Sequence, residues 1–241
     1  MTKVDLQSFP NADELASRVA SLWLDQIEAA NRAGRKHCVA LSGGRITQKF
    51  FILTVEQARA RKVSFAGVHF FWADERCLPP SDPESNFKLA NDLLFQPLNI
   101  LENQIHRLRG EDPPELAAKK ASDEISNLTE TRNKLPVLDL VFLGMGEDGH
   151  VASLFPDRQD GVGPADVFVA VHDSPKPPPD RISLSYAAIA SAKAVWVLAS
   201  GAGKERALRE SLSDDGKTPL ARVTKCRSGV TAFTDIALGH L

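Results

Sequence analysis

The sequence predicts an α/β fold, a doubly wound, Rossmann-like and mainly parallel sheet with helices on both faces. Three observations lead to this fold class. Short apolar runs typical of buried strands alternate with amphipathic stretches typical of helices. Several runs end in glycine-rich loops, and a parallel pair of strands needs a long crossover such as a helix. At 241 residues, with no fixed-period repeat, the chain is expected to form one domain over residues 1–241.

The first half of the chain supplies this alternation in order. A helix is expected over residues 11–34, because Asn11 and Glu14 can form a capping box and Gly34 can end the helix. The elements expected after it are strand 37–41, helix 47–60, strand 67–72, helix 84–94, short strand 104–108 and helix 114–131.

The second half continues the pattern with a strongly apolar strand over 138–143. Later strands are expected at 167–171, 194–198 and 230–233, with a helix over 203–212. In an open parallel sheet, ligands gather outside the carboxyl ends of the strands. The loops that follow the apolar runs are therefore the places to look for a functional site.

Composition excludes several function classes. The 29 basic and 31 acidic side chains give a net charge of -2, which predicts neither nucleic-acid nor membrane binding. The N-terminus has no apolar signal core and no run is long enough to cross a bilayer, so a cytoplasmic protein is expected.

Three widely spaced cysteines fit neither a disulfide framework nor a CxxC metal site, and we interpret them as reduced thiols, with Cys38 in a core strand. No long exposed apolar stripe stands out, which favours a monomer.

Two loops in the first half combine glycine or charge with the end of a strand. Ser42-Gly43-Gly44-Arg45 can bring backbone N–H groups and a cation close to an anion, although Gly-Gly is also common in plain turns. Phe71-Trp72 ends in Asp74-Glu75-Arg76, a pattern that most often marks a solvated rim. Arg76 has the planar fork of donors that suits phosphate, and Asp74 can accept hydrogen bonds from sugar hydroxyls.

A third loop follows the apolar strand ending at Leu143. Gly144, Gly146 and Gly149 match the GxGxxG pattern of dinucleotide sites. That interpretation requires an early position in the domain and a long following helix, whereas Pro156 allows only about two turns. We therefore reject a dinucleotide site.

The same loop presents an acid and a histidine two residues apart. Imidazole titrates near neutrality and can take a proton from water, while a carboxylate can fix its tautomer. A lone histidine near a helix start is more often structural, but the surrounding glycines and acids favour a catalytic role. Asp148 and His150 are the predicted catalytic pair.

The remaining candidates are cations near the later strands. Lys176 and Arg181 flank a proline-rich stretch that is either a linker or the stiff frame of a pocket, and Lys204 follows two glycines at a helix start, where phosphate binds readily. The sequence contains no GxSxG, HExxH or GxxxxGK[ST] motif. Hydrolysis by a general base, without metal or cofactor, is the simplest chemistry that remains.

Taken together, these loops resemble those of the 6-phosphogluconolactonase family, part of a larger group that includes glucosamine-6-phosphate deaminase. The resemblance runs in order from about residue 10 to residue 235. It is most specific in three segments, residues 71–76 with Ser85-Asn86, residues 143–156, and residues 176–178 leading into Arg181-Ile182.

This resemblance implies a single domain that hydrolyses a sugar-phosphate lactone, 6-phospho-D-glucono-1,5-lactone, to 6-phosphogluconate in the oxidative pentose phosphate pathway. It implies no metal and no organic cofactor. The catalytic histidine of the family falls on His150 and its acid on Asp148. The family's phosphate and substrate contacts fall on Ser42, Gly43, Gly44, Arg76, Lys176, Arg181 and Lys204.

Two alternatives stay open. The deaminase branch ends the histidine motif in asparagine-glutamate-proline, whereas Phe155 precedes Pro156 here, which favours the lactonase. A catalytically silent sugar-phosphate sensor on the same fold is the other alternative.

The sequence also departs from the family, which usually continues the first glycine pair with serine-threonine-proline where this chain has Arg45-Ile46-Thr47-Gln48. The loop is expected to hold its anion through Arg45 or Thr47, or to recognise a somewhat different sugar phosphate.

Overall fold

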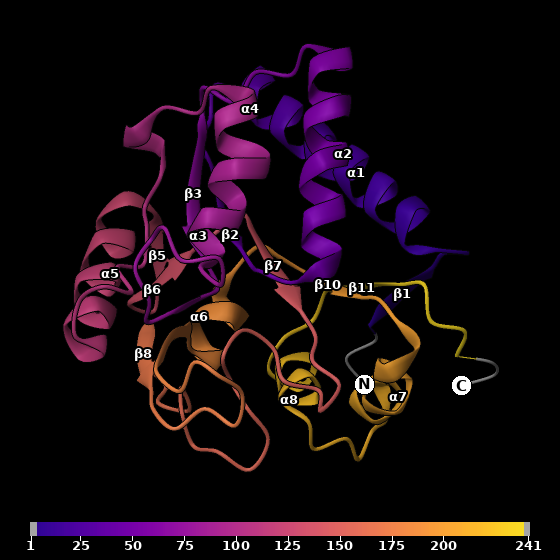
Figure 1. The fold of residues 1–241 in the computed structure, drawn as a ribbon, viewed down its shortest axis with the longest axis vertical. Coiled ribbons are helices and arrows are strands. Elements are labelled where there is room, and N and C mark those ends of the chain that lie inside the picture. Colours follow the sequence, from indigo (N-terminus) through magenta and orange to yellow (C-terminus); the bar gives the residue numbers. More distant parts are fainter. Residues whose placement is uncertain (1–3, 239–241) are drawn as a thin grey trace.

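A six-stranded parallel sheet lies between two layers of helices in the computed structural model, which describes residues 4–238 (Figure 1). The strand order is β1–β11–β10–β7–β2–β3, and all pairs are parallel. The strands are β1 (Asp5–Ser8), β2 (His37–Leu41), β3 (Val68–Trp72), β7 (Leu140–Gly144), β10 (Ala194–Ala199) and β11 (Val230–Thr234). The predicted fold class is confirmed.

Helices cover both faces of this sheet, as Figure 1 shows. On one side lie α1 (Ala12–Arg32), α2 (Arg45–Arg61) and the continuous segment of α3 (Asn86–Ala90), the π-helix η1 (Asn91–Phe95) and α4 (Gln96–Leu98). On the other side lie α6 (Tyr186–Ser191), α7 (Glu205–Leu212) and α8 (Pro219–Cys226). None of the helices within residues 4–238 combines the length and apolarity that a membrane span needs.

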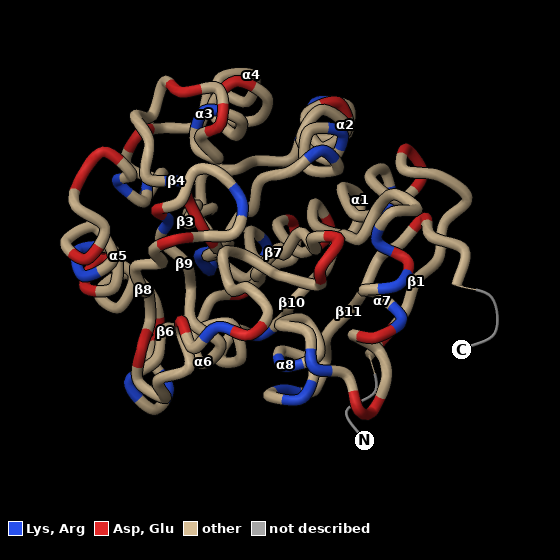
Figure 2. Tube along the Cα trace, turned by 60° about the horizontal axis from the view of Figure 1, so that its bottom comes forward, with Lys and Arg blue, Asp and Glu red and all other residues tan. Residues whose placement is uncertain are grey.

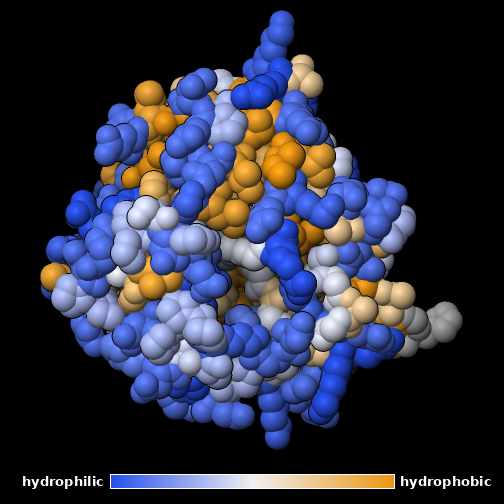
Figure 3. Space-filling model, viewed as in Figure 1, coloured by the Kyte–Doolittle hydropathy of each residue, from blue (hydrophilic) through white to orange (hydrophobic). Residues whose placement is uncertain are grey.

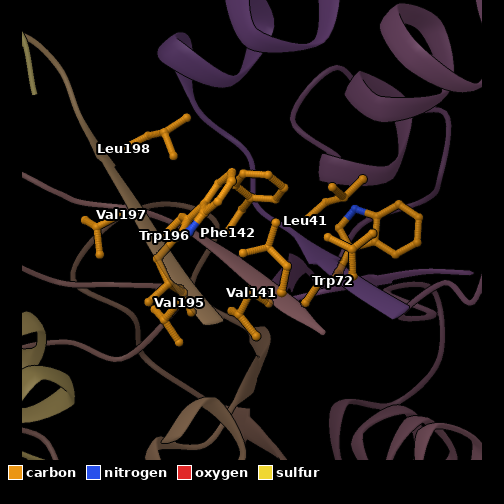
Figure 4. Close-up of a cluster of buried hydrophobic side chains, with 14 of the residues drawn as sticks. Leu41, Trp72, Val141, Phe142, Val195, Trp196, Val197 and Leu198 are labelled. Carbon is orange, nitrogen blue, oxygen red and sulfur yellow. The ribbon is translucent and has the colours of Figure 1, made fainter. Parts of the chain in front are cut away.

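The core forms because alternate side chains of the central strands point to opposite faces of the sheet (Figure 4). Phe142 and Trp196 point to the same side, and Val195 and Val197 point to the other. Trp23 of α1 packs edge-on against Phe142, with 5.3 Å between the ring centroids. Burial on both faces explains why these strands are almost wholly apolar.

The chain order places a topological switch between β2 and β7. From β2 the chain continues outward to β3, whereas from β7 it continues the other way, to β10. The two strands are in direct register, with Val39 opposite Leu140 and Ala40 opposite Val141. The loops after Leu41 and Gly144 therefore emerge side by side, and such a switch point is where doubly wound sheets bind ligands.

A second, antiparallel sheet lies beside this switch. It has the order β4 (Asp74–Arg76), β9 (Arg181–Leu184) and β8 (Phe168–Val171), and α5 (Pro114–Leu128) packs against it. The strand expected at 167–171 thus exists but does not join the parallel sheet. A hairpin of β5 (Glu130–Arg132) and β6 (Leu135–Val137) follows α5.

Other differences from the prediction are local. The strand expected over 104–108 is wrong, because Glu102–Gln104 is a 3₁₀ turn (η2) and only Ile105 bridges to Phe70. The Gln104 amide instead donates to the carbonyls of Phe65 and Val68, which ties the segment down by a side chain. The N-terminal cap is as predicted, since the Asn11 side chain accepts from the N–H of Glu14.

Candidate active site

A cleft open to solvent, of about 540 Å³, lies beyond the carboxyl ends of β2 and β7. Figure 3 shows a hollow near the centre of the face it draws. The lining residues are Ser42, Gly43, Gly44, Arg45, Ile46, Asp74, Arg76, Asn86, Gly144, Met145, His150, Ala152, Arg181 and Lys204. The cleft thus brings together all the predicted site residues except Asp148 and Lys176.

His150 lines the cleft and forms the predicted pair with Asp148, which is not among the lining residues. Nδ1 of His150 lies 2.5 Å from Oδ1 of Asp148, and the backbone N–H of His150 donates to the same oxygen. Nε2 has no hydrogen-bond partner among residues 4–238, and the side chain is 17% exposed. A ring held at Nδ1 and open at Nε2 is the arrangement that a general base requires.

Two neighbours fix the plane of the His150 ring. A Cβ on residue 146 would lie 2.1 Å from ring atoms Nδ1 and Cε1, so only glycine allows the imidazole to rest against this backbone. The ring of Phe155 also packs against the imidazole, with its centroid 4.8 Å from that of His150. The glycine spacing and the phenylalanine of the motif therefore both serve the histidine.

Burial and the charge of the partner shift the pKa of each residue of the pair in opposite directions. Burial lowers the pKa of His150 below its ordinary value of 6.5, and the attraction of Asp148 only partly reverses this. Burial raises the pKa of Asp148, but the charge of a protonated His150 and two hydrogen bonds outweigh it, so the net pKa is lowered. At neutral pH the imidazole is neutral and the carboxylate ionised. Nζ of Lys176 lies 3.6 Å from Oδ1 of Asp148, so Lys176 contacts the His150–Asp148 pair but is not one of the lining residues.

The loop after β2 delivers the amino end of α2 to the cleft. The Ser42 hydroxyl donates to the Phe142 carbonyl, which joins the loop to β7. Gly44 has a φ of 116° and gives α2 no side-chain cap. The first N–H groups of a helix have no partner inside the helix, so this end can bind an anion.

Asp74, Glu75 and Arg76 of β4 have three different roles. Oδ2 of Asp74 accepts from the Ser153 hydroxyl at 2.7 Å. Glu75 is buried and accepts from the N–H groups of Asn86 and Phe87, capping α3. This structural role was not predicted, although the polar Ser85-Asn86 pair at a helix start is its sequence signal.

Arg76 of β4 lines the cleft, and its guanidinium has hydrogen-bond donors without a partner among the described residues. Its Nη1 donates to the Glu84 carbonyl at 2.6 Å, while its Nε is buried without a partner among the described residues. An unsatisfied buried donor is costly unless a ligand supplies the acceptor. Arg76 is therefore suited to bind an anion.

Arg181 lines the cleft, but its guanidinium already makes several hydrogen bonds to the protein backbone. It is 4% exposed, and its guanidinium donates to the carbonyl oxygens of Lys176, Pro177 and Pro178. It also lies over the Phe155 ring, 5.6 Å from the centroid. Arg181 thus holds the proline-rich loop next to Phe155, although no residue of 174–179 is itself among the lining residues.

Lys204 enters the cleft from the end of η3 (Ala202–Lys204). Burial lowers the pKa of Lys204, and Arg45 lowers it further. Oδ1 of Asp235 accepts from the Gly201 N–H, and Oδ2 accepts from the Ser200 hydroxyl, so Asp235 holds the loop that carries Lys204. Asp235 was not predicted, because nothing in its sequence neighbourhood indicates this contact.

The cleft as a whole is cationic. Arg45, Arg76, Arg181 and Lys204 face it, against the single lining carboxylate of Asp74. Elsewhere, basic and acidic residues are interspersed along the described chain (Figure 2). Among residues 4–238, no group of three or more histidine, cysteine, aspartate or glutamate side chains is placed to hold a metal ion. The arrangement can bind an anionic molecule and present it to a neutral imidazole.

Comparisons with known proteins give a family match over most of the chain and several similar relatives. Residues 10–233 match the family model described as glucosamine-6-phosphate isomerases/6-phosphogluconolactonase. The chain is 33% identical to a 6-phosphogluconolactonase of Mycobacterium tuberculosis, covering 90% of this chain and 88% of the relative. It is 32% identical to the 6-phosphogluconolactonase of Haemophilus influenzae, covering 94% of each. The 6-phosphogluconolactonase structure from Leishmania guyanensis superposes with a TM-score of 0.83 at 26% identity, covering 96% of each chain.

Proposed function

Because this chain belongs to the family of glucosamine-6-phosphate isomerases and 6-phosphogluconolactonases, we propose that it hydrolyses 6-phospho-D-glucono-1,5-lactone to 6-phosphogluconate, with His150 as general base. It is an enzyme of the lactone-hydrolase class. The single family match over residues 10–233 supports a single domain over residues 1–241 as the working unit.

The observation that carries this proposal is the open Nε2 of His150 at the edge of a cationic cleft. Asp148 accepts the Nδ1 proton, which leaves the lone pair on Nε2. Nε2 takes a proton from the water that attacks the lactone carbonyl, and the imidazolium formed is stabilised by the adjacent Asp148 carboxylate. The backbone N–H groups lining the cleft stabilise the oxyanion of the tetrahedral intermediate. When the intermediate collapses, the bond between the carbonyl carbon and the ring oxygen breaks, and the His150 imidazolium returns its proton to the leaving oxygen, which becomes the free hydroxyl of the opened product.

The other end of the substrate is held by its phosphate. The amino end of α2 at Gly43 and Gly44, the unsatisfied Arg76 and the half-buried Lys204 supply donors of the type that phosphate prefers. The Asp74 carboxylate accepts one hydrogen bond from Ser153, and its remaining lone pairs would accept hydrogen bonds from sugar hydroxyls. Holding the phosphate fixes the carbonyl over His150, and such positioning is a large part of the acceleration.

The direct test is a lactonase assay on freshly generated 6-phosphogluconolactone, with spontaneous hydrolysis subtracted and unphosphorylated gluconolactone as a control. We expect hydrolysis of the phosphorylated lactone well above background. Failure to accelerate it, together with ammonia release from glucosamine-6-phosphate, would replace the lactonase by a deaminase. Binding of 6-phosphogluconate without turnover of either substrate would indicate a sensor. Phe155, packed on His150, places no ionisable group where the deaminase motif has its glutamate.

A further inference from the structure

We propose that Thr218, at the amino end of α8, is a positioning residue that holds the Gly149 peptide and thereby keeps the His150 imidazole in place at the edge of the cleft. This role rests on the lactonase function proposed above and adds to it a residue outside the cleft lining. Thr218 lies far from His150 in the sequence, and it reaches the loop that carries His150 only through the packing of α8.

The loop segment 146–150 is joined to the rest of the chain at few points. Two hydrogen bonds close it on itself, because the Gly146 N–H donates to the His150 carbonyl at 2.9 Å and the Gly149 N–H donates to the Gly146 carbonyl at 3.1 Å. Beside Glu147 and Asp148 the loop borders a second hollow open to solvent, of about 900 Å³, and not packed protein. Such a hollow supplies no close packing, so the position of the loop depends on its contacts at Gly149.

The amino end of α8 makes those contacts. The Leu220 N–H donates to the Gly149 carbonyl at 3.1 Å, and within residues 4–238 this is the one backbone hydrogen bond from 146–150 to another segment. A Cβ on Gly149 would lie 2.6 Å from Cβ of Thr218 and 2.7 Å from its Cγ2, so the Thr218 side chain rests directly on the Gly149 backbone. Because the Gly149 peptide leads into His150, a displacement of this peptide also moves the imidazole.

The Thr218 hydroxyl fixes the other side of the same side chain. Thr218 is 5% exposed, and its Oγ1 accepts from the Ala221 N–H at 3.1 Å, which caps α8. The same Oγ1 shares a hydrogen bond of 2.6 Å with the Ser211 hydroxyl of α7. The hydroxyl therefore anchors Thr218 to two helices while its carbon atoms support Gly149. A side chain that is itself held in one place can hold a neighbouring group precisely.

The experiment compares Thr218→Ala, which removes the anchor and the methyl group, with Thr218→Ser, which keeps the helix cap and loses only the Cγ2 contact. Thr224→Ala is the matched control, because Thr224 lies in the same helix, is 6% exposed, and its hydroxyl donates to the Ala221 carbonyl. Steady-state assays measure kcat and KM for 6-phosphogluconolactone, and thermal unfolding measures Tm.

NMR provides a measurement that needs no turnover. The Hε1 resonance of His150 is identified by its loss in His150→Asn. Its chemical shift reports the position of the imidazole, because the Phe155 ring lies against it with 4.8 Å between the ring centroids.

For Thr218→Ala we expect kcat to fall about tenfold while KM changes by less than about twofold, since a misplaced base slows the chemical step and leaves phosphate binding intact. Thr218→Ser should lower kcat about threefold with a Tm near that of the wild type. Thr224→Ala should lower Tm, because it also removes buried atoms, but keep kcat within about twofold of the wild type. The His150 resonance should shift in both Thr218 variants and stay in place in Thr224→Ala.

Equal kcat values in Thr218→Ala and Thr224→Ala would overturn the positioning role, as would a loss in Thr218→Ala that appears in KM alone. If Thr218→Ala does not fold, Thr218→Ser decides, and wild-type kcat with an unshifted His150 resonance in that variant refutes the role. A wild-type protein that hydrolyses no lactone refutes the proposed function, while the His150 resonance in the Thr218 variants still decides whether Thr218 places the ring.

Discussion

Replacing His150 by asparagine separates the base from the rest of the site. Asparagine cannot take a proton from water, but its amide can still donate to Asp148, which is 2.5 Å from Nδ1 of the native ring. The residues assigned to phosphate binding are untouched. The variant therefore removes proton transfer and leaves the positioning of the substrate in place.

The expected size of the effect follows from the state of the ring. Because burial lowers the pKa of His150 below 6.5, the imidazole is almost wholly in its basic form at pH 7.5, and its full contribution is lost on substitution. General-base catalysis contributes about 10²- to 10⁴-fold. We expect kcat for His150→Asn to fall by that range, while KM changes by less than about threefold, since phosphate binding is common to ground and transition states.

The assay is steady-state hydrolysis of freshly generated 6-phosphogluconolactone between pH 5 and 8, corrected for the spontaneous reaction. A base works when deprotonated, so a lowered pKa moves the acid limb of kcat/KM to lower pH. The midpoint of the acid limb in the wild-type profile should therefore lie below pH 6.5. Near-normal kcat in His150→Asn, or an acid limb centred above pH 6.5, would refute the reasoning.

Other predictions concern the cleft and the core. Arg76→Ala should raise KM for the phosphorylated lactone about tenfold with little change in kcat, because its unsatisfied donors are assigned to phosphate; an unchanged KM removes it from that role. Gly146→Ala should lower kcat about 10²-fold in the same assay, since the new Cβ would lie 2.1 Å from the His150 ring and displace it; full activity would show that the ring tolerates the shift. Asp235→Ala should raise KM by about threefold to tenfold by loosening the loop that carries Lys204, whereas Asp235→Asn, which keeps an acceptor, should recover part of the loss; identical kinetics in both would argue against a positioning role. Burial lowers the pKa of His37 from 6.5 to about 4, so its contribution to the free energy of unfolding is complete above pH 6.5 and is lost as pH falls toward 4, by about 3 kcal/mol in total. Urea unfolding at pH 7 and pH 4 should show a smaller pH dependence in His37→Asn than in the wild type; equal dependence would contradict this assignment.

The fold could be predicted where local pattern and burial coincide. The apolar runs that became β2, β3, β7, β10 and β11 are buried on both faces, so their composition alone marks them. The strands β4 and β9 escaped prediction because they carry charged side chains, Arg76 and Arg181, where strand patterns are apolar. Such local conflicts are expected at functional sites.

The candidate site was predictable as a set of loops but not as a set of contacts. The rule that ligands bind beyond the carboxyl ends of strands selected the loops at Ser42 and His150, and the switch between β2 and β7 brings them together. The three predicted cations have different partners: Lys176 contacts Asp148, Arg181 donates to backbone carbonyls, and Lys204 lines the cleft. These tertiary contacts cannot be read from sequence spacing. Glu75 and Asp235 were missed because each accepts from backbone N–H groups distant in sequence, at the start of α3 and in the loop after β10.

The central claim is spatial, and a crystal structure with bound 6-phosphogluconate tests it most directly. The account predicts that the product carboxylate lies within hydrogen-bond distance of Nε2 of His150, with the phosphate at the amino end of α2 against Lys204 and Arg45. A product bound the other way round, with its phosphate at His150, or bound outside this cleft, would contradict the account.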